Sequence, residues 1–160
     1  TLHFLGFPDG AVIADLALRR EISAIIRIEK PDRVLTQSAE RRYDRIYASH
    51  PDHLATGEAT LCAVYPDARN PFAYPELIAE GHEEWTAREV WLTAHEHPDH
   101  YVDVTATFER KLAALQAHVS QTSHNSELTS QVRKRVADHA ARAGWEDGRL
   151  AEAFMVVATA

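Results

Sequence analysis

The chain has only one cysteine, Cys62, so no disulfide bond can form within its 160 residues. A chain without an internal disulfide is typical of a reducing compartment, and we therefore expect a cytoplasmic protein. Cys62 lies in a small apolar stretch with no neighbouring group that would lower the pKa of its thiol. We predict that Cys62 packs in the core and does not act as a nucleophile.

The sequence also lacks long hydrophobic runs and an excess of positive charge. No apolar run approaches the ~18 residues that a membrane-spanning helix needs, which excludes a span. Lys plus Arg is 17 and Asp plus Glu is 24, so the formal net charge is −7. An acidic chain has no overall field to attract phosphates, and nucleic-acid binding is not expected. The 45% of apolar residues suffices for a core, and we predict a single domain over residues 1–160.

Three common enzyme motifs are missing as well. The sequence contains no Gly-x-Ser-x-Gly elbow, no phosphate-binding P-loop and no Gly-x-Gly-x-x-Gly string. Serine hydrolases, nucleotide hydrolases and dehydrogenases therefore lack a supporting motif.

The apolar residues that are present indicate an α/β fold. Residues 2–6 predict a buried strand, residues 13–28 an amphipathic helix that ends before Pro31, and residues 33–36 a second strand. A strand, a helix and a strand in this order are typical of a parallel α/β sheet. Further strands are predicted at 89–93, 101–104 and 154–157, and further helices over 108–119 and 128–140.

A polar loop, residues 37–49, follows the second strand and leads into the string His50-Pro-Asp-His53. Ligands bind at the carboxyl ends of strands in parallel sheets. A helix should begin at this string, since Pro51 suits a first turn and Asp52 is favoured near the positive helix N-terminus.

The two imidazoles of this string flank a carboxylate within four residues. A neutral imidazole is a good zinc ligand, and a neighbouring carboxylate can hold a ring N–H and fix the orientation of the ring. The same spacing also fits a helix N-terminus that carries two solvated histidines. The spacing alone does not separate these two interpretations.

The surrounding sequence resembles the PIG-L/LmbE family of zinc-dependent N-acetyl-sugar deacetylases. The resemblance rests on blocks that stand in the family's order, namely residues 4–10, 50–57, 67–71, 102–105, 111–115 and 118–121. It implies a Rossmann-like, three-layer α/β fold with a mostly parallel sheet. It also implies hydrolysis of the N-acetyl amide of an N-acetylglucosaminyl conjugate, such as a glycolipid or a thiol-sugar.

The resemblance further implies a role for each residue that matches the family's motifs. His53 would be a ligand of Zn²⁺, and His50 would stabilise the oxyanion or protonate the leaving amine. Asp52 would orient the His50 imidazole. Asp9 lies in a Pro-Asp-Gly turn and would hydrogen-bond a sugar hydroxyl, a role that is compatible with the turn.

One part of the family's pattern is not in the sequence. The family carries its other zinc ligands and its general base in an upstream Ala-His-Pro-Asp-Asp motif, which these 160 residues do not contain. We therefore expect the C-terminal portion of a deacetylase that lacks its first βα segment. The alternative is a non-catalytic binding or assembly module that keeps the deacetylase shell and packs into a homo-oligomer.

A second His-Pro-Asp-His string stands at residues 97–100, close to His95. Its flanks predict an extended segment and not a helix, and we interpret the three histidines as a surface metal-binding sequence without a physiological metal. The sequence leaves the roles of His118 and Gln121 open.

Overall fold

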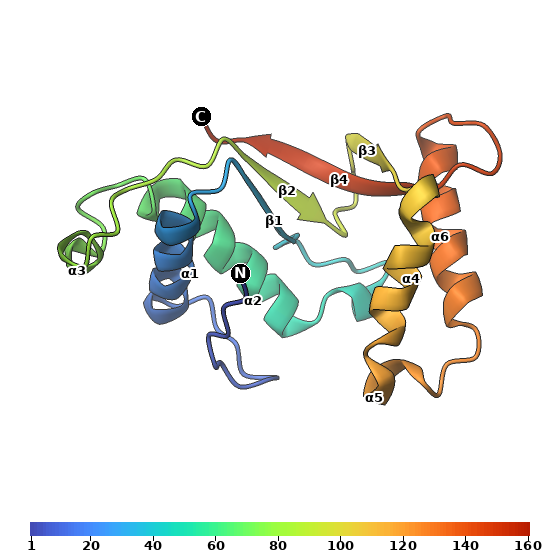
Figure 1. Ribbon diagram of the computed structural model, residues 1–160, viewed down its shortest axis with the longest axis horizontal. Helices are drawn as coiled ribbons and strands as arrows, with labels where there is room; N and C mark the ends of the chain where they lie inside the picture. The colour runs from blue at the N-terminus through green and yellow to red at the C-terminus, as the bar shows by residue number, and fades with distance from the viewer. The chain divides into compact units, whose positions relative to one another are not determined.

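The computed structural model describes all 160 residues, and the chain divides into two units (Figure 1). The first unit comprises residues 1–97 and 155–160, and the second comprises residues 98–154. The predicted single domain over residues 1–160 stays a prediction. No helix is both long enough and apolar enough to cross a membrane.

The first regular element of the first unit is α1 (Leu16–Glu29), which confirms the predicted amphipathic helix. It begins where the Asp15 carboxylate accepts a hydrogen bond from the backbone N–H of Leu18 at 2.9 Å, a typical N-cap. It ends at Lys30, which has a left-handed φ of 49° and precedes Pro31. The helical periodicity and the end before Pro31 therefore agree with the structure, whereas the helix begins at Leu16 and not at residue 13.

The sheet of the first unit is built on β1 (Arg33–Gln37) and β2 (Glu89–Thr93), which pair in parallel with Val34 opposite Val90. The strand β4 (Ala151–Ala158) continues from the second unit and pairs antiparallel with β2. One face of these strands packs against α1 and the segment after α2 through a buried apolar cluster. The buried members of this cluster are Ile26, Ala63, Val64, Ala68, Ala87, Val90 and Leu92.

The helix α2 (Pro51–Cys62) begins at the predicted residue, with Pro51 in its first turn. It approaches β1 so closely at Gly57 that a Cβ atom there would lie 2.5 Å from the backbone oxygen of Gln37. Only glycine permits this contact without a shift of the backbone. The close approach fixes the position of α2 against the carboxyl end of β1.

Three short elements complete the first unit. A 3-10 turn, η1 (Ile46–Ala48), interrupts the predicted polar loop before α2, and η2 (Ala63–Asp67) continues directly from α2. The short helix α3 (Pro75–Ala79) follows.

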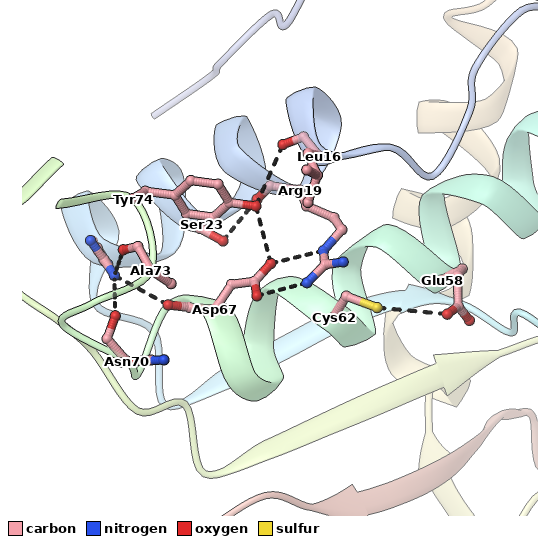
Figure 2. Close-up of polar contacts among 10 residues, drawn as sticks. Leu16, Arg19, Ser23, Glu58, Cys62, Asp67, Asn70, Ala73 and Tyr74 are labelled. Atoms are coloured by element: carbon pink, nitrogen blue, oxygen red, sulfur yellow. Dashed lines mark hydrogen bonds and ion pairs between the residues drawn. The ribbon is translucent and has the colours of Figure 1, made fainter. Parts of the chain in front are cut away.

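Buried charged side chains hold the segment after α2 on α1. Figure 2 shows the Asp67 carboxylate accepting two hydrogen bonds from Arg19, at 2.9 and 2.8 Å, and one from the Tyr74 hydroxyl at 3.3 Å. The buried Arg27 guanidinium donates to the backbone oxygens of Asp67, Ala68, Asn70 and Ala73. These contacts stabilise an irregular segment that has little regular backbone pairing of its own.

The second unit contains β3 (His100–Asp103), η3 (Thr105–Thr107), α4 (Phe108–Gln116), α5 (Val119–Thr122) and α6 (Leu128–Arg142). The strand β3 pairs antiparallel with residues 151–154 of β4. The core of the second unit consists of Phe108, Leu112, Val132, Val136 and Leu150. The single helix predicted over 108–119 is wrong, because α4 ends at Gln116 and the Val119 side chain is exposed.

Two other sequence predictions are wrong. Residues 2–6 form no strand, and the Leu2 and Phe4 side chains are 82% and 91% exposed, because no neighbouring strand pairs with this apolar run. The sheet, in the order β1-β2-β4-β3, is mixed and not mostly parallel, because β4 runs antiparallel to both of its neighbours. The chain therefore has a mixed α/β fold.

The close approach of α2 to β1 predicts an unusual response to a helix-favouring substitution. Gly57→Ala should lower the free energy of unfolding by about 1–3 kcal/mol, because the new Cβ overpacks the contact with Gln37. Alanine in an ordinary helix position would instead add up to about 1 kcal/mol of stability. Urea denaturation measures the change, with the exposed neighbour substitution Thr56→Ala as the control. A Gly57→Ala variant as stable as the wild type would contradict this packing.

Candidate functional site

The two histidines of the first His-Pro-Asp-His string lie at the N-terminal end of α2. His53 stands one helical turn before Gly57, whose α-carbon lies against the end of β1 at residues 37–39. His50 and His53 are both exposed, and their ring centroids are 5.5 Å apart. The structure therefore brings two solvent-accessible imidazoles together at the carboxyl end of a parallel strand, as the sequence predicts.

The His50 ring is held by the backbone. Its Nδ1 atom accepts a hydrogen bond from the backbone N–H of Asp52 at 3.3 Å, in the N-cap position of α2. A neutral imidazole that accepts at Nδ1 carries its proton on Nε2. His50 can therefore offer an N–H donor to a bound molecule.

The Asp52 carboxylate makes contacts that the sequence analysis did not anticipate. It is only 8% exposed and accepts hydrogen bonds from the backbone N–H groups of Gly10 at 2.6 Å and of Val12 at 3.3 Å. The family resemblance implies that this carboxylate orients the His50 ring, and that role stays a prediction. A partner 42 positions away in the chain leaves no signal in local sequence.

These hydrogen bonds tie the start of α2 to the Asp9 turn, which we define as residues 8–12. The turn is closed by a hydrogen bond from the Ala11 N–H to the Pro8 oxygen at 3.2 Å, and Gly10 has a left-handed φ of 80°. Asp9 is exposed within this turn. The two regions that carry the predicted site residues are thus in direct contact.

Zinc requires more ligands than this site offers. Tight zinc sites use at least three protein ligands, and nowhere in residues 1–160 do three or more His, Cys, Asp or Glu side chains form a group that could hold a metal ion. His50 and His53 form a pair, while the Asp52 carboxylate already accepts two backbone N–H groups. These residues do not fit a complete zinc site by themselves.

The histidines around the second His-Pro-Asp-His string, His95, His97 and His100, lie in different surroundings. The His95 side chain is 7% exposed; its Nε2 lies 3.0 Å from a Glu40 oxygen and its Nδ1 accepts from the His97 N–H. His95 thereby links the loop before α2 to the segment after β2. His97 is exposed, and His100 begins β3 in the second unit. His118 and Gln121 are exposed residues of the second unit, and their roles stay open.

Cys62 lies at the C-terminal end of α2 and is half-buried. It belongs to neither buried apolar cluster, so the prediction that it packs in the core is wrong. Its Sγ atom is 3.6 Å from a Glu58 carboxylate oxygen (Figure 2). Burial raises the pKa of the Cys62 thiol, and the charge of Glu58 adds to this increase while Arg19 opposes it. The raised pKa favours the protonated thiol. That Cys62 is no nucleophile stays a prediction.

Part of this chain matches a known protein family. Residues 1–64 match the family PIG-L, described as GlcNAc-PI de-N-acetylase. This matched region contains all four predicted site residues, Asp9, His50, Asp52 and His53.

Two curated relatives and one solved structure are similar over most of the chain. A diacetylchitobiose deacetylase from Thermococcus kodakarensis is 31% identical over 75% of this chain and 43% of its own length. A probable N-acetyl-alpha-D-glucosaminyl L-malate deacetylase 2 from Bacillus anthracis is 40% identical over 75% of this chain and 48% of its own length. The chain thus spans about half the length of these relatives.

The solved structure is an N,N'-diacetylchitobiose deacetylase from Pyrococcus horikoshii. It matches 98% of this chain and 57% of its own, with a TM-score of 0.86 and 23% identity. At this level of identity, the likeness establishes a shared fold.

The environment of Cys62 predicts slow alkylation at neutral pH. Iodoacetamide should react with the folded protein more slowly than with a free thiol, and the rate should rise with pH, because the raised pKa keeps the thiolate scarce. Glu58→Gln should speed the reaction, because it removes a negative charge that opposes the thiolate. The exposed Glu83→Gln serves as the control, and mass spectrometry follows the modification. Faster alkylation in wild type than in Glu58→Gln would contradict this account.

Proposed function

Because this chain is related to the PIG-L family through residues 1–64, we propose that the protein hydrolyses the N-acetyl amide of an N-acetylglucosaminyl conjugate. The observation that carries the proposal is that Asp52, which lies between His50 and His53 in the sequence, accepts hydrogen bonds from the Asp9 turn, all within the matched residues. The substrate class is supported by the relatives, whose names give diacetylchitobiose and N-acetylglucosaminyl L-malate as substrates.

Each side chain in this arrangement has a chemical role in the proposed reaction. The Nε2–H of His50 donates a hydrogen bond to the oxyanion that develops on the acetyl carbonyl, and the neutral ring keeps this proton. The proton that the leaving amine takes up comes from the attacking water. Asp9, exposed in its turn, accepts a hydrogen bond from a sugar hydroxyl. Asp52 holds both regions in place through its carboxylate and its backbone N–H.

We also propose that the activity depends on Zn²⁺, with His53 as one ligand. The family resemblance implies this metal, and the exposure of the His53 ring supports the role. The other ligands would have to come from outside these 160 residues, since no third ligand lies with His50 and His53.

We also propose a Rossmann-like arrangement of layers, a cytoplasmic location and a homo-oligomer. A Rossmann-like, three-layer arrangement is supported by the parallel β1–β2 pair and by the likeness to a solved deacetylase. A cytoplasmic location is supported by the single cysteine alone. A homo-oligomer remains an open proposal.

A second candidate function is a non-catalytic binding module that keeps the deacetylase fold. The observation that favours it is the absence of a group of three metal ligands in residues 1–160. Such a module would bind an N-acetylglucosaminyl group without releasing acetate. Metal content and acetate release separate the two functions.

The first test is acetate release from N-acetylglucosamine, diacetylchitobiose and N-acetylglucosaminyl L-malate by the protein expressed from its complete gene. We expect activity on at least one of them, and His50→Ala should lower kcat by about 10²-fold or more, because the hydrogen-bond donor to the oxyanion is lost. The exposed His124→Ala is the matched control, with circular dichroism to verify folding. Unchanged kcat in a folded His50→Ala variant would contradict the assigned role.

The second test measures zinc by elemental analysis. We expect the protein from the complete gene to bind zinc and to lose it in His53→Ala, whereas residues 1–160 alone should bind none tightly, because two imidazoles cannot form a closed site. Full zinc content in a folded His53→Ala variant would show that His53 is no ligand. A zinc-free, inactive protein that still binds N-acetylglucosamine would favour the binding module.

A further inference from the structure

The N-terminal segment, residues 1–15, has no helix or strand and is held by few side chains. His3 contacts Glu29 at 2.7 Å near its beginning, and Asp15 caps α1 at its end. Between these points, the Asp9 turn is tied to the rest of the first unit by the Asp52 carboxylate. The Asp52 carboxylate thus supplies the side-chain hydrogen bonds that hold the turn of the exposed Asp9.

We propose that Asp52 is a positioning residue whose carboxylate anchors the Asp9 turn beside His50 and His53, so that the turn recognises the hydroxyls of an N-acyl amino sugar. This inference rests on the proposed function and adds to it the residue that sets affinity for the sugar. Asp52 itself need not touch the substrate, since it is buried and its two hydrogen bonds point to the backbone of Gly10 and Val12.

The physical argument is one of preorganisation. An irregular segment samples many conformations, and a ligand that must order it loses affinity. Hydrogen bonds from backbone N–H groups to a carboxylate are stronger than bonds between neutral groups, and at 2.6 Å the Gly10 contact is short. The carboxylate thus orders the turn before the sugar arrives.

This role differs from the orientation of His50, which the structure provides by other means. The Nδ1 atom of His50 already accepts the backbone N–H of Asp52, and a substitution of the Asp52 side chain keeps that N–H. Loss of the carboxylate should therefore weaken sugar binding and leave the Nε2–H donor of His50 in place.

The first variant is Asp52→Asn, which keeps the size of the side chain but can accept with only one of its two terminal atoms. We expect the Kd for N-acetylglucosamine and the KM to rise by about tenfold, the effect of roughly one lost hydrogen bond, with little change in kcat or its pH profile. Amide hydrogen exchange over residues 10–12 should accelerate. The control is Asp15→Asn, which removes the same charge but leaves a good N-cap on α1.

A second variant disturbs the turn and leaves the carboxylate intact. Gly10→Ala forces a side chain into a left-handed conformation with φ of 80° and should reproduce the rise in Kd and KM. Gly6→Ala is the matched control, because Gly6 has a similar φ of 73° and equally open space around its α-carbon, while its N–H makes no bond to Asp52.

The outcomes separate this inference from the function on which it rests. If the wild type binds and hydrolyses no N-acetylglucosamine conjugate, the proposed function fails. If the wild type binds N-acetylglucosamine and Asp52→Asn binds it equally well, or if Asp52→Asn lowers kcat and shifts its pH profile while Gly10→Ala has no effect, the anchoring role is wrong.

Discussion

The close approach of α2 to β1 at Gly57 is the constraint on which the site depends. The α-carbon of Gly57 lies so near the backbone of residues 37–39 that no side chain fits between them. A helix is a rigid element with a rise of about 1.5 Å per residue, so fixing one residue fixes those a turn away. His53 and His50 take their place at the carboxyl end of β1 for this reason.

A second constraint acts at the other end of α2. There the chain turns into an irregular segment whose backbone oxygens would be buried without partners. Arg27 donates to four of them, and Arg19 pairs with the Asp67 carboxylate, so that α1 supplies the missing donors. Burial lowers the pKa of Arg27, and its hydrogen bonds to backbone oxygens offset part of that cost. Residues 67–71, which contribute to the family resemblance, therefore serve the scaffold in this structure.

The candidate site could be predicted in part. The string His50-Pro-Asp-His53 is local, and its helix start and paired imidazoles follow from residue type and spacing. The exposure of Asp9 also agrees with a Pro-Asp-Gly turn. The contact between these regions could not be predicted, because the Asp52 carboxylate can bond any backbone N–H that the fold brings near. The pairing of His95 with Glu40 could not be predicted from the sequence for the same reason.

The sequence by itself determined the elements whose signals are local. Pro31 and Pro51 marked the end of α1 and the start of α2, and the apolar run at residues 89–93 formed β2 where it was predicted. Only the tertiary structure decided whether an apolar run becomes a strand and in which direction it runs. Residues 2–6 pair with no strand, and the Leu2 and Phe4 side chains are exposed. The strand β4 pairs with two strands and runs antiparallel to both. Helix caps are satisfied within a few residues, but strand hydrogen bonds and the partners of a buried carboxylate lie far away in the chain.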